Sequence, residues 1–177
     1  MPKPAPPAFL LQTVLVLGLA SAPASAGFTK RFDWSLKTPS GESVSLRSFK
    51  GKVVLVAFWT TTCGPCHAAR PFFEELQTRF ADRGLVVLSV NVKEKPELVR
   101  KWLKAHPTTL KVLLDPEGKV EDALDLDGQP AMALFDTSDS LNWSAAGISQ
   151  HTKDDLSARI DFMAPGAPGS VPVGTLK

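Results

Sequence analysis

The sequence has few cysteines, no excess of charge of either sign and no long apolar run. Of its 177 residues, 20 are Lys or Arg and 18 are Asp or Glu, so the formal net charge is only +2. This balance offers no concentrated positive charge for neutralising phosphates, so nucleic-acid binding is not expected as the main role. The 12 Gly and 15 Pro show no collagen period, and the prolines cluster at the two ends. The folded part therefore lies in the middle.

The N-terminal segment has the pattern of an export signal. Lys3 is its only charge, the stretch from Ala8 to Ala20 is almost wholly apolar, and Ala24-Ser25-Ala26 is a small-residue cleavage pattern. The apolar run is shorter than the roughly 20 residues that span a bilayer, and no Cys is nearby to carry a lipid. We therefore predict a signal peptide over residues 1–26 and an exported, periplasmic protein. If the signal were not cleaved, it would anchor the protein to the membrane instead.

The remaining chain is large enough to fold without a covalent staple. A mature chain of 151 residues can bury about 70% of the surface of its unfolded state. We predict one folded domain over residues 27–163. The Pro- and Gly-rich residues 164–177 are predicted to form a disordered tail.

The two cysteines are better explained by chemistry than by stability. Cys63 and Cys66 are the only cysteines in the chain, and they lie three residues apart. A bridge between them closes almost no loop, so the entropy it removes from the unfolded chain is small. In an exported protein, where disulfides persist, this spacing favours a redox-active pair.

Apolar patterning predicts strands and helices that alternate along the chain. Two short alternating segments, Phe32 to Leu36 and Ser43 to Leu46, flank a turn-rich stretch and predict a hairpin. The continuous apolar run from Val53 to Trp59 predicts a central strand covered on both faces. Further strands are expected at residues 85–92, 111–114, 131–135 and 141–145, and helices from the cysteines to Gly84, from Pro96, over 120–124 and over 154–163. This order predicts an α/β fold whose C-terminal half is mixed.

The sequence Trp59-Thr60-Thr61-Thr62-Cys63-Gly64-Pro65-Cys66 lies where the central strand ends and a helix begins. Unpaired N–H groups and the positive end of the helix dipole favour a thiolate on Cys63, and the thiolate is the nucleophile. Pro65 fits the first helical turn because its missing N–H has no partner to lose. Cys66, one turn later, is expected to face the protein and to attack a mixed disulfide formed on Cys63.

From Phe32 to Met163 the chain resembles the thioredoxin superfamily, and within it the exported TlpA/ResA-type thiol-disulfide oxidoreductases. The resemblance is carried by the stretch from Gly51 to Trp59, the Cys63-to-Cys66 motif, Pro71 and Gln129-Pro130. It implies a thioredoxin fold, with a central mixed β-sheet flanked by helices, an N-terminal β-hairpin and a strand-helix insertion. It also implies that Pro130 is the cis-proline that packs beside the active-site cysteines.

The resemblance also implies roles and partners. The Gln129-Pro130 edge would present backbone to an extended substrate segment, and Trp59, Gly64 and Pro65 would complete the substrate-binding surface. Asn91-Val92-Lys93-Glu94 is similar to the segment that holds an acid near the disulfide, so Glu94 is the candidate for proton exchange with Cys66. The implied protein is a monomer without a cofactor that exchanges disulfides with protein substrates and receives electrons from a membrane or periplasmic donor. The Gly-Pro dipeptide implies a reductant, in cytochrome c maturation or periplasmic redox homeostasis.

Three features depart from the family pattern. Thr62 replaces the Trp that usually precedes the first cysteine. Ala57 stands where thioredoxins have a buried Asp and many exported relatives an Asn, so no acid at residue 57 is available for proton transfer. Ala131-Met132 replaces the polar pair that commonly follows the cis-proline, which bears on partner choice.

Other interpretations of the motif fit less well. Cys63-Gly64-Pro65-Cys66-His67 satisfies the c-type haem attachment pattern. A haem would need His67 and a second axial ligand, usually within a helical wrapping, whereas this motif follows a β-rich run; the second-ligand candidates are Met132, Met163 and His151. A peroxiredoxin would have Pro at the position of Val56, and two thiolates with one adjacent His are too few for zinc. A thioredoxin-like binding module whose disulfide is structural or regulatory remains the non-enzymatic alternative.

Overall fold

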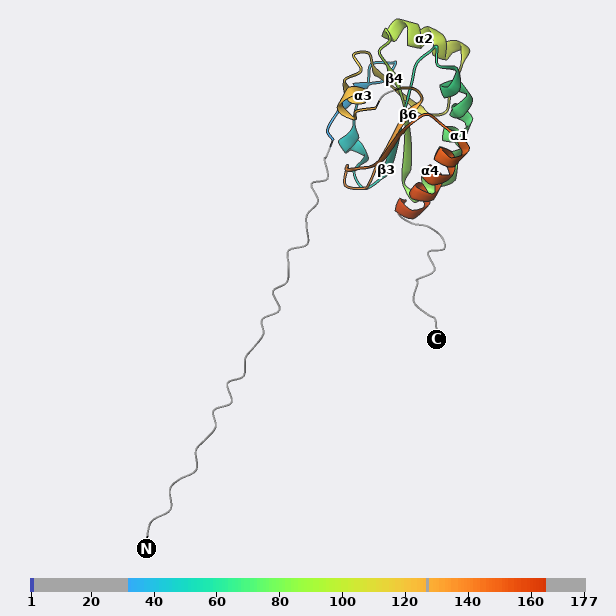
Figure 1. The fold of residues 1–177 in the computed structure, drawn as a ribbon. Helices are drawn as coiled ribbons and strands as arrows, with labels where there is room; N and C mark the ends of the chain where they lie inside the picture. The colour runs from blue at the N-terminus through green and yellow to red at the C-terminus, as the bar shows by residue number, and fades with distance from the viewer. Residues whose placement is uncertain (2–31, 127, 165–177) are drawn as a thin grey trace.

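A seven-stranded sheet forms the centre of the molecule, with helices on both of its faces (Figure 1). The computed structural model describes residue 1, residues 32–126 and residues 128–164. The predicted signal peptide with its cleavage site and residues 165–177 of the predicted tail lie outside the described residues. In the part that is described, no helix combines the length and apolar character needed to cross a membrane.

The elements alternate as the apolar pattern predicts. In chain order they are β1 (Ser35–Lys37), β2 (Ser43–Ser45), the 3-10 helix η1 (Leu46–Phe49), β3 (Val53–Trp59), α1 (Gly64–Phe80), the 3-10 helix η2 (Ala81–Arg83), β4 (Leu85–Val92), α2 (Pro96–Ala105), β5 (Lys111–Asp115), α3 (Lys119–Ala123), β6 (Ala131–Phe135), β7 (Leu141–Ala146) and α4 (Gln150–Met163).

The strand order is β2-β1-β5-β4-β3-β6-β7. β3, β4 and β5 run parallel, whereas β6 pairs antiparallel with β3, and β7 with β6. β1 and β2 form the predicted antiparallel hairpin, which joins the sheet through β5. The predicted α/β fold with a mixed sheet is therefore confirmed.

Every residue of β3 is buried because the sheet is covered on both faces. The odd-numbered apolar residues of β3, from Val53 to Ala57, pack with α1 and α4. The even-numbered ones, from Val54 to Phe58, pack with the N-terminal segment, η1 and α3. Because parallel strands buried on both faces carry apolar side chains at every position, the continuous apolar run is explained, and the central-strand prediction is confirmed.

Some boundaries differ from the predictions, and local hydrogen bonds explain two of the differences. Residues 46–49 form a 3-10 helix because Ser45 caps it, its hydroxyl accepting the N–H of Arg47 at 3.2 Å. α4 begins four residues early because the Ser149 hydroxyl accepts the N–H of Thr152. Ala164, assigned to the tail from sequence, is buried and ends α4.

The topology brings together, at the end of β3, the cysteine motif and the Pro130 turn, which are far apart in the chain. β3 ends at Trp59, and α1 begins five residues later at Gly64, so the cysteines lie just beyond the carboxyl end of the strand. β6 pairs with β3 through Phe58 and Ala131, which places the preceding Pro130 at the same end. Such edges of α/β sheets are common positions for functional sites.

Candidate active site

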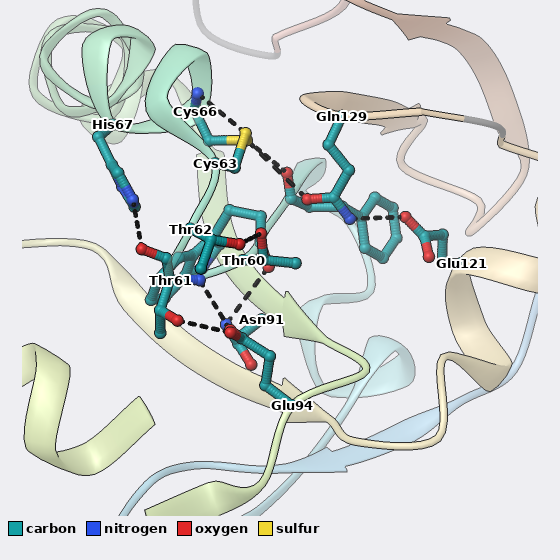
Figure 2. The surroundings of a disulfide bond; sticks show 12 residues. Thr60, Thr61, Thr62, Cys63, Cys66, His67, Asn91, Glu94, Glu121 and Gln129 are labelled. Carbon is teal, nitrogen blue, oxygen red and sulfur yellow. Dashed lines mark hydrogen bonds between the residues drawn. A yellow bond between two sulfur atoms is a disulfide. The ribbon is translucent and has the colours of Figure 1, made fainter. Parts of the chain in front are cut away.

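A disulfide joins Cys63 and Cys66 at the start of α1 (Figure 2). Cys63 is the N-cap residue of this helix, and its Sγ accepts the backbone N–H of Cys66 at 3.2 Å. Cys63 is half-buried, whereas only 6% of Cys66 is exposed. The structure therefore places the two sulfurs in different settings, one beside a helix N-terminus and near the surface, the other inside.

Two oxygen atoms face the buried sulfur. Cys66 Sγ lies 3.9 Å from Gln129 Oε1 and 4.0 Å from the carbonyl oxygen of Phe58. In the disulfide this sulfur carries no proton, so these are contacts rather than hydrogen bonds. On reduction, both oxygens are placed to accept a hydrogen bond from the Cys66 thiol.

The Gln129–Pro130 peptide bond is cis, as the sequence resemblance implies. The carbonyl oxygen of Pro130 accepts the N–H of Gly147 at 2.7 Å, which ties this turn to the end of β7. Pro130 is buried and Gln129 is half-buried. Gln129 Nε2 donates to Glu121 Oε1 at 2.9 Å, so the side chain that contacts Cys66 is itself held by an acid (Figure 2).

Glu94 lies near the motif and holds the loop that precedes it. Its carboxylate accepts hydrogen bonds from the N–H of Thr61 at 2.7 Å, the hydroxyl of Thr61 at 2.5 Å and Nδ2 of Asn91 at 2.6 Å. Asn91 Nδ2 also donates to the carbonyl oxygen of Trp59 at 3.3 Å. The contacts found for Glu94 tie the end of β4 to the loop before Cys63, and proton exchange with Cys66 stays a prediction.

The predicted substrate-binding residues divide into exposed and buried ones. Gly64 and Pro65 are exposed beside Cys63, as is Thr62. Trp59 is buried, and its ring lies 4.9 Å from that of Trp102 on α2, centroid to centroid. Trp59 therefore packs against α2, and its contact with substrate stays a prediction.

A second group of rings flanks the start of α1. His67 and His106 stack on Trp102, with ring centroids 4.7 and 4.2 Å away. His67 Nε2 also lies 3.1 Å from the carbonyl oxygen of Thr61, to which it donates when it carries the proton. The contacts of this histidine help to fix α2 and the Thr61 loop against α1.

Ala57 leaves space behind the disulfide. A cavity of about 30 Å³ there is lined in part by Ala57, Cys66 and Ser89. This volume is about enough for one water molecule. The residue that replaces the family's Asp thus borders the buried sulfur and brings no charge to it.

Charged groups gather on the α3 side of the site. Glu121 is 3% exposed, and its carboxylate forms an ion pair with Lys93 Nζ at 3.0 Å. Lys93 Nζ also bonds Asp122 at 2.9 Å. The hydrogen bond to Asp122, and then that to Glu121, raises the pKa of Lys93 above its ordinary value.

Residues 32–126 and 128–164 contain no cluster of three or more His, Cys, Asp or Glu suited to a metal ion.

Sequence reasoning did not single out Glu121 or Thr61. Glu121 belongs to the short α3, where an acid in the first turn is ordinary and gives no sign of burial. Thr61 is one of three consecutive threonines, and nothing in the pattern distinguishes it. Their partners, Gln129 and Glu94, are distant in the chain, so only the fold reveals these contacts.

Residues 29–144 match the AhpC/TSA family. The thiol-disulfide oxidoreductase ResA of Geobacillus kaustophilus is 27% identical over 133 residues, covering 75% of each chain. The thioredoxin-like protein YneN of Bacillus subtilis is 42% identical over 89 residues, which span 49% of this chain and about half, 52%, of YneN.

Solved structures of thiol-disulfide exchange proteins have a similar fold. A protein from Chlorobium tepidum assigned as the thiol:disulfide interchange protein DsbE superposes with a TM-score of 0.69 at 28% identity, covering 74% of this chain and 92% of that one. The exposed lipoprotein thioredoxin Etrx1 of Streptococcus pneumoniae has a TM-score of 0.66 at 27% identity, with coverage of 73% and 98%.

The sheet order, the CxxC disulfide at the start of α1 and these neighbours define a thioredoxin-like thiol-disulfide oxidoreductase. The chain belongs to the AhpC/TSA family, and its similarity to ResA and to the DsbE structure places it with the ResA and DsbE type.

Proposed function

We propose that the protein acts outside the cytoplasm, as a reductant of protein disulfides, with Cys63 as the attacking residue and Cys66 as the resolving one. The hydrogen bond from the N–H of Cys66 to Cys63 Sγ at the N-terminus of α1 carries this proposal. An N–H donor and the helix dipole stabilise negative charge, so they favour a thiolate on Cys63 after reduction.

The reaction then has two steps. The Cys63 thiolate attacks one sulfur of a substrate disulfide, forming a mixed disulfide and releasing the other substrate sulfur as a thiolate. Cys66 then loses its proton and attacks Cys63 Sγ, which forms the Cys63–Cys66 bond and releases the second substrate sulfur. Both electrons come from the dithiol, so an electron donor must reduce the disulfide again.

We propose that Gly64, Pro65 and the Gln129-Pro130 edge contact the substrate, with Trp59 as a support beneath. The exposure of Gly64 and Pro65 beside Cys63 supports this assignment. Glu94 is proposed to exchange a proton with Cys66. The redox partner is proposed to be a membrane or periplasmic electron donor, and cytochrome c maturation or periplasmic redox homeostasis the process served.

The export pattern of residues 1–26 and the similarity to an exposed lipoprotein thioredoxin support the location. Measuring the mass of the mature protein distinguishes cleavage after Ala26 from retention of the segment as an anchor.

The direction of electron flow is tested by equilibrating the protein with glutathione at known ratios. A reductant should have a potential nearer to the value of about −270 mV for thioredoxin than to about −120 mV for the oxidant DsbA. A potential near the second value would overturn the reductant assignment and leave the exchange chemistry in place.

A further inference from the structure

Glu121 is a buried acid linked to the active site through a single side chain. Its Oε1 accepts Gln129 Nε2 at 2.9 Å, and the Oε1 of the same Gln129 faces Cys66 Sγ at 3.9 Å. Its other oxygen pairs with Lys93 Nζ at 3.0 Å. Figure 2 shows the three side chains in line, from Glu121 through Gln129 to the disulfide.

The start of α3 holds Glu121 in place. The carboxylate of Asp115, 2% exposed, accepts the backbone N–H groups of Lys119, Val120 and Glu121 at 3.0, 2.9 and 3.4 Å. These bonds satisfy the first turn of the short helix. Because Asp115 ends β5, the position of Glu121 is fixed to the sheet.

The chemistry of Glu121 decides which way the Gln129 amide points. An ionised carboxylate only accepts hydrogen bonds, so the NH₂ group of Gln129 must face it. The carbonyl oxygen of the amide is then directed at Cys66. With the carbonyl oxygen of Phe58 at 4.0 Å, it is one of two acceptors that lie beside the sulfur.

We propose that Glu121 is a positioning residue that, through Gln129, keeps the Cys66 thiol protonated in the reduced protein. An acceptor stabilises S–H and repels S⁻, so it favours the neutral form. The thiolate is thereby confined to Cys63, and Cys66 releases its proton only when it attacks the mixed disulfide, with Glu94 as the proposed acceptor. This inference rests on the proposed roles of the two cysteines.

Other charged groups lie around Cys66, but their hydrogen bonds go elsewhere. On α1, His67 bonds the carbonyl oxygen of Thr61 and Arg70 bonds that of His106. Glu94, after β4, is bonded to Thr61 and Asn91. Lys93 acts on Glu121 itself and on Asp122. Cys63 is also a titrating thiol once reduced, so the titration of Cys66 has to be measured without it.

The proposal is tested by the titration of Cys66, followed by the ultraviolet absorbance of its thiolate in a Cys63→Ser protein. The titration midpoint should lie above the ordinary cysteine pKa of about 8.5. Glu121→Gln frees the amide to turn its NH₂ group toward the sulfur. It should lower the midpoint by about one unit, a tenfold gain in thiolate fraction at neutral pH.

Asp122→Asn is the matched control. Asp122 is the neighbouring acid and also pairs with Lys93, but its side chain is 64% exposed and the bonds found for it do not include Gln129. This variant should leave the midpoint of Cys66 unchanged. A shift as large as that of Glu121→Gln would overturn the proposal, because loss of charge alone would then explain it.

A double-mutant cycle separates the relay from direct charge repulsion. Gln129→Met removes the acceptor, keeps a side chain of similar length at a half-buried position and should itself lower the midpoint. In the Gln129→Met protein, Glu121→Gln should have no further effect. If Glu121→Gln changes the Cys66 midpoint equally with and without Gln129, the proposal is contradicted. It is also contradicted if Gln129→Met alone leaves the midpoint unchanged, and this second result does not require the Glu121→Gln protein to fold. If the unaltered protein shows no disulfide exchange, the proposed function is rejected, but the titrations of Cys66 still test the role of Glu121.

Discussion

Cys63 and Cys66 have the same side chain, and their surroundings make them different. Cys63 caps α1 and receives an N–H, which favours the thiolate. Cys66 is buried against two carbonyl-type oxygens, which favour the thiol. These two settings support the proposal that Cys63 attacks and Cys66 resolves.

This difference predicts the order of alkylation. In the reduced protein, a limiting amount of iodoacetamide should label Cys63 first, because its sulfur is more accessible and more readily ionised. Peptide mass analysis after brief exposure measures the ratio of the two labels. The same reagent applied to unfolded protein should label both equally and serves as the control. Preference for Cys66 in the folded protein would contradict the geometry.

The roles of single residues were predictable from sequence where a local pattern defines them. The strand-to-helix junction and the spacing of the cysteines locate the disulfide without any structure. The cis bond before Pro130 required a resemblance, because its partner segment lies 67 residues away in the chain. Glu121 and Gln129 become neighbours only through the fold between α3 and β6, so no local pattern could identify the pair.

Hydrogen bonds at the ends of strands and helices hold the site in position. The loop between β3 and α1 is tied to β4 by Glu94 and Asn91, and the turn before β6 is tied to β7 by Gly147. At the other end of α1, Gly84 adopts a φ of 84° and ends the helical segment where the sequence predicts. The motif is thus fixed by neighbours on both sides.

The hydrogen bonds between Glu94 and Thr61 allow the predicted proton role of Glu94 to be tested. Glu94→Gln should shift the pH dependence of thiol reactivity and slow exchange about 10²-fold, as expected when general acid-base assistance is lost. Thr61→Val is the control, since it removes one hydrogen bond to Glu94 and keeps the charge. Rates of exchange measured from acid to alkaline pH distinguish the two variants.

A purely structural role for Glu94 predicts a different result for these two variants. If Glu94 only orders the loop, both variants should slow exchange by similar factors and leave the shape of the pH profile intact. That result would remove Glu94 from proton exchange while leaving Cys63 and Cys66 in their roles.

Elements were easier to predict than their ends. The run of seven apolar and mostly β-branched or aromatic residues in β3 is typical of a strand buried on both faces, and the structure confirms this prediction. The 3-10 helix at residues 46–49 and the early start of α4 depend on single serine caps, Ser45 and Ser149. Caps act over one turn and leave little trace in apolar periodicity, so the boundaries shifted by a few residues.

At the scale of the whole molecule, the sheet order assembles the site from segments far apart in the chain. β3 is central and the cysteines follow its end, Glu94 lies two residues after β4, and Pro130 directly precedes β6. Trp102 of α2 packs against the start of α1 by stacking on His67. The fold thus presents the Cys63–Cys66 disulfide at one edge of the sheet.

The central claim is that Cys63 attacks and Cys66 resolves, and its most direct test is to trap the intermediate. A disulfide-bonded protein substrate is mixed with the reduced protein and with its Cys63→Ser and Cys66→Ser variants, and the products are resolved without reductant. The unaltered protein should reduce the substrate, Cys66→Ser should accumulate a mixed disulfide through Cys63, and Cys63→Ser should do neither. A mixed disulfide formed through Cys66, or no exchange by the unaltered protein, would contradict the account.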